Sequence, residues 1–236
     1  MLRIVTFKWK PAPGYHTRYE ARHVNVMARM VARFYQAPHE VVCITDDAEG
    51  LDAGIRVVPL WSDFADLPNP KGPLFPSCYR RLKTFSAEAA QLIGERFVML
   101  DLDCVLTDDV RPLWDRPEDF VILKSHYERL WYSGAMILMH AGARAQVWTE
   151  FDPLTSPAQA RAEGHFGSDQ AWIAARLGPN EATWSTQDGV YSFSQHVAPN
   201  RGALPANARL VNFHGIINPW DDRVMEQLGW VREYWR

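Results

Sequence analysis

The hydrophobic positions of this chain fall into two kinds of pattern, short continuous runs and longer amphipathic stretches. Continuous apolar runs over residues 2–7, 40–45 and 54–60 predict buried β-strands. Between the first two runs, apolar residues recur every three or four positions, which predicts an amphipathic helix from Thr17 to Tyr35. Strand, helix and strand in this order are typical of a parallel α/β sheet.

The same pattern continues after residues 61–78, where four prolines and Gly72 predict a loop. Further strands are expected at 97–102, 120–124, 134–139 and 208–213, and further helices at 79–94, 142–151, 168–177 (with Ser168 as N-cap) and 221–235. The chain contains no internal repeat and no low-complexity tract. We therefore expect one domain over residues 1–236, which ends in a helical tail at 221–236.

Composition narrows the class of protein. Hydrophobic residues make up 47% and charged residues 22% of the 236 positions, as in globular proteins. The formal net charge of -3 gives no basic excess for a nucleic-acid partner. An odd set of three cysteines without a CxxC motif predicts neither a disulfide framework nor a zinc site. With no signal peptide or apolar stretch of about 20 residues, a cytoplasmic protein is expected.

The segment "FVMLDLD" places Asp101 and Asp103 directly after a run of buried apolar residues. Residues i and i+2 of a strand face the same way, so both carboxylates can point together if extended geometry continues through Asp103. Ligands of open α/β sheets bind beyond the carboxyl ends of the strands. Two carboxylates there suit Mg²⁺ or Mn²⁺, which prefer oxygen ligands. The alternative is that one aspartate caps a turn and the other is solvated.

Two families place such an acidic pair after a hydrophobic strand. "DLDCVLTD" resembles the box of the haloacid-dehalogenase phosphatases, but Cys104-Val105 replaces the usual Gly-Thr, and no later GDxxxD is found. That reading remains a second hypothesis. A third is a binding module on a degenerate transferase scaffold, which turns over nothing.

The glycosyltransferases of family 8, the glycogenin and bacterial lipopolysaccharide galactosyltransferase type, share more of the chain. Four segments in order resemble theirs: "RFVMLDLDCVLTDDVRPLW" (96–114), "WYSGAMILMHAG" (131–142), "GSDQAWI" (167–173) and "VNFHGIINPW" (211–220). The resemblance implies a single GT-A (Rossmann-like) domain with an open, mostly parallel sheet and helices on both faces. It also implies metal-dependent transfer of a sugar from a nucleotide-diphosphate sugar, a UDP-sugar, to an acceptor hydroxyl, with retention of configuration.

The resemblance also implies a set of site residues. Asp101, Asp103 and His214 would hold Mn²⁺ or Mg²⁺, and Asp169 and Gln170 would lie beside the reacting sugar. Leu102, Gly215 and Asn218 would contact the donor, although Asn218 replaces the lysine that the family uses for the diphosphate. Ser133 and Gly134 likewise stand where the family has Asn or Asp with a small residue. Thr6 and Lys8 are placed at the donor by the fold alone, and Arg81 and Lys83 are candidate phosphate ligands.

The acceptor cannot be read from the sequence, which leaves a glycan, a lipid-linked sugar or a protein open. Three of the ten tryptophans lie in or beside the tail, at Trp220, Trp230 and Trp235. Packing of the tail onto the domain is the first interpretation. A peripheral membrane contact or an acceptor clamp is the alternative.

Overall fold

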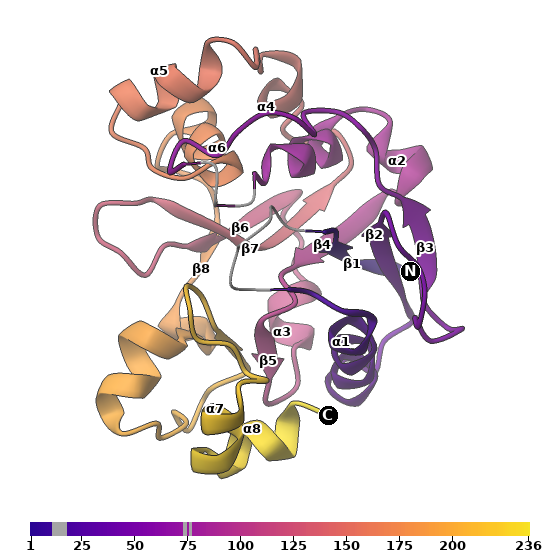
Figure 1. Cartoon of the computed structure of the whole chain (residues 1–236), viewed down its shortest axis with the longest axis vertical. Helices are drawn as coiled ribbons and strands as arrows, with labels where there is room; N and C mark the ends of the chain where they lie inside the picture. The colour runs from indigo at the N-terminus through magenta and orange to yellow at the C-terminus, as the bar shows by residue number, and fades with distance from the viewer. Residues whose placement is uncertain (11–17, 73–74, 76) are drawn as a thin grey trace.

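The structure of the chain is a computed structural model that describes residues 1–10, 18–72, 75 and 77–236 (Figure 1). Its centre is a seven-stranded sheet in the order β3-β2-β1-β4-β7-β6-β8. The strands are β1 (Leu2–Lys8), β2 (His39–Thr45), β3 (Arg56–Pro59), β4 (Arg96–Leu100), β6 (Phe120–Lys124), β7 (Tyr132–His140) and β8 (Thr183–Trp184). Only β7 runs antiparallel to its neighbours, β4 and β6, so the expected open and mostly parallel sheet is confirmed.

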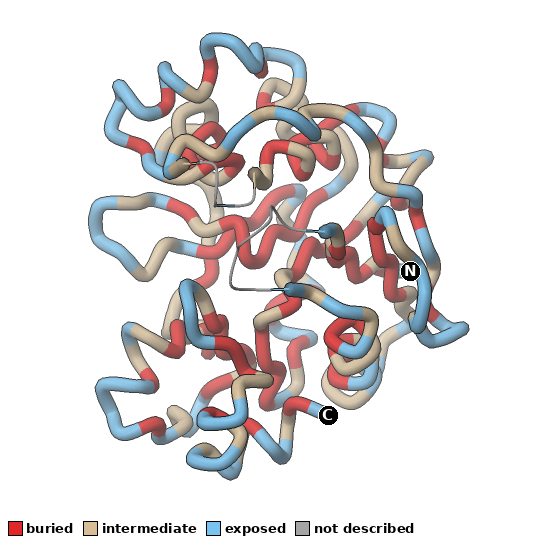
Figure 2. Tube along the Cα trace, viewed as in Figure 1, coloured by how far each residue is buried: buried red, intermediate tan, exposed pale blue. Residues whose placement is uncertain are grey.

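Adjacent residues of the strands point to opposite faces of this sheet, and each face has its own core. On one face Ile4 and Val98 pack with Met27 of α1 (Ala21–Phe34), beside α3 (Arg111–Trp114). On the other face Val5 and Phe97 pack with residues of α5 (Ser156–Ala162) and of four further short helices. These are η1 (Tyr79–Phe85), α2 (Ala89–Leu92), α4 (Gln146–Thr149) and α6 (Asp169–Leu177). Figure 2 shows the central strands as the most continuously buried part of the chain.

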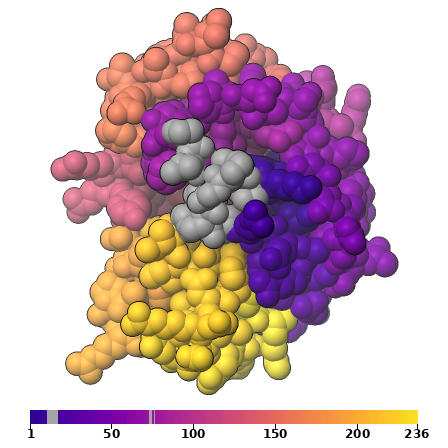
Figure 3. Space-filling model, in the orientation of Figure 1, coloured from indigo at the N-terminus to yellow at the C-terminus, as the bar shows by residue number. Residues whose placement is uncertain are grey.

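A second sheet of three short strands, in the order β5-β10-β9, forms the centre of what we call the C-terminal lobe, residues 185–236 together with β5. The strands are β5 (Cys104–Leu106), β9 (Val190–Ser192) and β10 (Leu210–Asn212). Around them lie η2 (Thr186–Asp188), the π-helix η3 (Phe193–Val197), η4 (Ala198–Asn200), α7 (Asp222–Gln227) and α8 (Gly229–Tyr234). The tail packs beside α1 (Figure 3), as the first interpretation of its tryptophans expected.

Several predicted elements are shorter than expected. The helix at 79–94 is a 3₁₀ turn and a short α-helix, because Ser86 is extended and ends the first of them. Only 146–149 of the expected helix at 142–151 is helical, and the tail helix breaks at the extended residue Leu228. Ser168 precedes α6, but its side chain makes no capping bond and accepts from the backbone N–H of Cys78 instead, at 3.2 Å.

Some elements had no signal in the sequence pattern, among them α5 (Ser156–Ala162) and the strands β5, β8 and β9. Each of these strands has only two or three residues, too few to show a period. No helix in the described part of the chain is long and apolar enough to span a bilayer.

Candidate active site

A polar cavity of about 200 Å³ lies beyond the carboxyl end of β4, and we call it the carboxylate cavity. The structure brings six of the predicted site residues together there: Arg81, Asp101, Asp103, Asp169, Gln170 and His214. They come from η1, from the turn after β4, from the start of α6 and from the segment after β10. Ser133 and Gly134 of β7 also line the cavity.

The two aspartates reach the cavity through a turn rather than along a strand. Strand β4 stops at Leu100, and the N–H of Cys104 donates back to the carbonyl of Asp101 at 3.3 Å. The extended geometry through Asp103, which was the condition for the two carboxylates to point together along a strand, is therefore not present. The turn still directs both carboxylates into one cavity, and it sends Leu102 into the hydrophobic core.

Arg81 connects two of the three carboxylates. Its Nη1 lies 2.9 Å from Oδ1 of Asp101, its Nε lies 3.3 Å from Oδ2 of Asp169, and it also donates to the carbonyl of Gly134. Burial alone would lower the pKa of Arg81, but Asp101 and Asp169 raise it above its usual value, so the guanidinium stays charged. Gly134 lies close to this pair: a Cβ there would be 3.3 Å from Arg81 Nη2, so a larger residue would require a small shift of the guanidinium.

Of the three carboxylates, Asp103 is the one whose negative charge is least compensated by neighbouring groups. Its Oδ2 accepts a long hydrogen bond of 3.4 Å from the hydroxyl of Tyr19, and its buried Oδ1 has no hydrogen-bond partner among the described residues. Burial, and then the charge of Asp101, raises the pKa of Asp103 well above its usual value. Burial also raises the pKa of Asp101, against the opposing effect of Arg81. The cavity thus concentrates negative charge that its one buried arginine does not balance.

This donor set fits a hard divalent cation in part. Two carboxylates with an unused buried oxygen are suitable ligands for Mn²⁺ or Mg²⁺. The third predicted ligand is engaged elsewhere, because Nε2 of His214 lies 2.7 Å from Ser192 Oγ and 3.1 Å from Ser194 Oγ. Across the described residues, no three His, Cys, Asp or Glu side chains form a group that could hold a metal ion. Nε2 of His214 could act as a ligand only after it leaves the two serines.

Other predicted donor residues do not line this cavity. Lys8 ends β1 and pairs with Asp47 at 3.6 Å, whereas Lys83 pairs with Asp63 at 2.9 Å and lies over the rings of Trp61 and Trp148. Thr6 is buried in β1. Asn218 is held by Asp221, whose Oδ2 accepts from its backbone N–H at 2.8 Å, and Gly215 lies in the same loop with a φ of 88°.

The sequence did not point to several residues that line or support the cavity. Lys71 reaches it from the proline-rich loop, where a lone cation was the only signal. Asn212 ends β10 beside it, and its Oδ1 is buried without a partner in the described part of the chain. Cys78 also lines the cavity, and burial raises the pKa of its thiol to about 12, so the thiol stays protonated.

Comparisons with known proteins bear on the fold of this chain. No family model and no curated protein sequence matches the chain. The solved structure of the galactosyltransferase LgtC with donor and acceptor sugar analogs matches 98% of this chain and 93% of its own, at 13% identity and a TM-score of 0.65.

Two further glycosyltransferases match over part of their length. GlyE of Streptococcus pneumoniae TIGR4 has a TM-score of 0.59 at 11% identity, over 94% of this chain and 57% of its own. The bifunctional WbbM has a TM-score of 0.58 at 11% identity, over 94% of this chain and 47% of its own. The chain therefore has the GT-A fold, the fold of these glycosyltransferases.

Proposed function

We propose that this chain is a glycosyltransferase that moves a sugar from a nucleotide-diphosphate sugar, a UDP-sugar, to an acceptor hydroxyl. One observation carries the proposal: three carboxylates, two of them paired with one buried arginine, lie in a cavity at the carboxyl edge of a GT-A sheet. That edge is where open α/β sheets bind their ligands. The structural neighbour LgtC was solved with donor and acceptor sugar analogs, which agrees with this substrate class.

The donor diphosphate needs positive charge, which the cavity itself supplies poorly. Arg81 is already paired twice, and Lys71 is the remaining cation among the described lining residues. We propose that Asp101 and Asp103, joined by His214, hold Mn²⁺ or Mg²⁺, which neutralises charge on the leaving diphosphate when it is bound. Burial lowers the pKa of His214, so its imidazole is neutral and able to act as a ligand at neutral pH.

Asp169 and Gln170 would act on the sugar. Asp169 is buried and fixed by Arg81, with its carboxylate at the cavity wall. Gln170 lies next to it, and its Nε2 makes a long bond of 3.4 Å to the carbonyl of Phe166. A fixed carboxylate and an amide oxygen can stabilise positive charge that develops on the reacting carbon. We also propose that the anomeric configuration of the sugar is retained, as the resemblance to family 8 implies.

A kinetic experiment tests these roles. The protein is incubated with UDP-glucose, UDP-galactose or UDP-N-acetylglucosamine and Mn²⁺, and released UDP is measured. Asp169→Asn and Gln170→Ala are expected to lower kcat and kcat/KM together, by about 10²-fold, with UDP affinity unchanged. Gln159→Ala on the exposed face of α5 is the matched control, because the amide of Gln159 donates to Glu163 one helical turn away and lies outside the carboxylate cavity.

The outcomes separate the competing functions. Retained turnover in both variants would move the chemistry away from α6. Release of inorganic phosphate from simple monoesters would instead support a phosphatase, although the pairing of Asp101 with Arg81 disfavours its role as a nucleophile. Binding of UDP with no turnover of any donor would support the binding module.

A further inference from the structure

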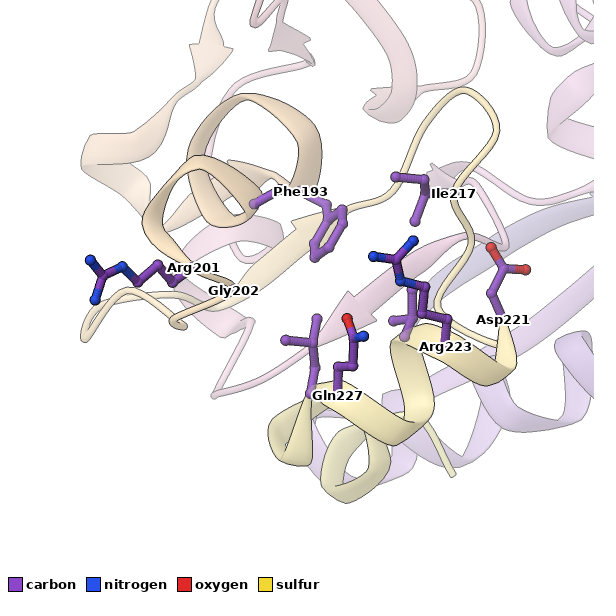
Figure 4. Close-up of a pocket in the computed structure, with 10 residues that line it drawn as sticks. Phe193, Arg201, Gly202, Ile217, Asp221, Arg223 and Gln227 are labelled. Atoms are coloured by element: carbon purple, nitrogen blue, oxygen red, sulfur yellow. The ribbon is translucent and has the colours of Figure 1, made fainter.

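A second cavity, of about 520 Å³, lies in the C-terminal lobe and shares no described lining residue with the carboxylate cavity. It is a half-open cavity lined by η3, η4, the loop 215–221 and α7 (Figure 4). Its walls are mainly apolar, with Phe193, Ile217, Val224 and Leu228 among them. A volume of this size is in the range of small-molecule binding sites.

The mouth of this cavity carries positive charge that the fold leaves unpaired. Arg223 extends from α7 toward Phe193 and Ile217 (Figure 4), and it forms no ion pair within the described ranges. Arg201 is also at the rim, but it points outward. The one acid there, Asp221, already accepts hydrogen bonds from the backbone N–H and the side-chain amide of Asn218, at 2.8 and 3.5 Å.

The backbone around the cavity has features that are common at functional sites. Segment η3 is a π-helix, a form often found beside ligands. Arg201 has a φ of 57°, in the left-handed region that a non-glycine residue rarely adopts. The next residue, Gly202, is fixed from α8, because its carbonyl accepts from Trp230 Nε1 at 2.9 Å. The wall is thus held in place rather than loosely packed.

We propose that this cavity binds an amphiphilic anion, a single alkyl or isoprenyl chain that carries one phosphate group. The chain would lie against Phe193, Val224 and Leu228, and the phosphate would pair with Arg223, which is free to donate. Ile216 at the neighbouring loop tip is 77% exposed and extends the apolar surface outward. Binding at this site does not require glycosyl transfer. An experiment can therefore reject this proposal without rejecting the proposed function.

The site also adjoins the candidate active site through one segment. Phe193 faces the second cavity and stacks on Phe213 at 4.2 Å, while Ser192 and Ser194 on either side of it bond to His214. An occupant would therefore contact the segment that positions His214.

Calorimetric titration with dodecyl phosphate, below the concentration at which it forms micelles, tests the proposal. We expect saturable binding at one site per chain, weaker binding of dodecanol and none of inorganic phosphate. Arg223→Gln should weaken dodecyl phosphate by about tenfold, the usual scale of one charge-assisted hydrogen bond. Ala198→Trp, on an exposed position of the rim, should fill the cavity and remove binding.

Arg232→Gln is the matched control, because this exposed arginine of α8 does not line the cavity. Melting curves of all three variants should stay close to wild type, since each substitution is at an exposed position. The proposal is overturned if inorganic phosphate binds as tightly as dodecyl phosphate. It is equally overturned if no binding occurs, or if Arg223→Gln and Ala198→Trp both bind like wild type.

Discussion

Arg81 in the carboxylate cavity and Arg223 in the C-terminal lobe are surrounded in opposite ways. Arg81 is 7% exposed and contacts Asp101, Asp169 and the carbonyl of Gly134. Arg223 is exposed at the mouth of an apolar cavity, with no ion pair to any described residue. A guanidinium whose N–H groups are already paired holds the neighbouring groups in place. An unpaired guanidinium can instead bind an incoming anion. The expectation that Arg81 binds a donor phosphate stays a prediction, and it would require Arg81 to exchange partners.

The largest expected effect on stability comes from replacing Arg81, the arginine that is already paired. Arg81→Met leaves Asp101 and Asp169 without their counter-charge, so the free energy of unfolding should fall by about 3 kcal/mol. Arg223→Met should change it by less than about 0.5 kcal/mol, as is usual for an exposed side chain. Urea denaturation of both variants measures the difference. Equal losses in the two variants would contradict the comparison.

The next effect concerns His23 of α1, which stacks on Trp220 of the C-terminal lobe at 4.0 Å. Its Nδ1 accepts from the backbone N–H of Glu20, so the neutral ring is required, and burial lowers its pKa to about 4. The unfolded chain binds this proton at about pH 6.5, so the free energy of unfolding should fall as the pH drops from 6.5 to 4. We expect a loss of about 2 kcal/mol from His23.

Denaturation of His23→Gln across this pH range measures the contribution. The variant should lose less stability with acid than wild type, whereas His140→Gln on the exposed end of β7 should behave like wild type. Part of the decline should remain in His23→Gln, because burial also lowers the pKa of His126 to about 4. An unchanged pH profile in His23→Gln would contradict the assignment.

The smallest expected effect is a gain in stability, whereas the replacement of Arg81 causes a loss. The raised pKa of Asp103 means that its contribution to stability is present below the unfolded value of about 3.9 and is lost as pH rises through the folded value. Asp103→Asn should therefore raise the free energy of unfolding by about 1 kcal/mol at pH 7 in a chelating buffer. The same variant should lose any stabilisation that Mn²⁺ gives to wild type. If the metal-free variant is instead less stable than wild type, the neighbouring groups already compensate the charge of Asp103, and the prediction is wrong.

The sequence predicted the parts of the fold that depend on local pattern. The strand at 120–124 has the bounds expected, and α1 buries Val24, Met27 and Val31 as their spacing predicts. The expected helix at 79–94 kept its apolar period but not its continuity, because the extended Ser86 separates η1 from α2. The strands β5 and β9 are each stabilised by β10, which is distant in the sequence, so no local pattern could reveal them.

The same limit applies to the candidate site. The motifs located Asp101, Asp103, Asp169 and Gln170, and the fold brings all four to one cavity. The ion pairs that Arg81 makes with Asp101 and Asp169 cross between separate elements and cannot be read from spacing. The contact of His214 with Ser192 and Ser194 depends in the same way on the lobe that folds around β10.

The docking of the tail on α1 has a consequence for the order of events during synthesis. Arg33 donates to the carbonyls of Glu233, Tyr234 and Arg236, and the first of these lies 200 residues further along the chain. At about 5–20 residues per second, a ribosome needs about 10–40 s to deliver those partners. Until then, His23 and Phe34 of α1 lack Trp220 and Tyr234, the rings that they contact in the folded chain. This face of α1 therefore stays exposed in the nascent chain until the last segment has been synthesised.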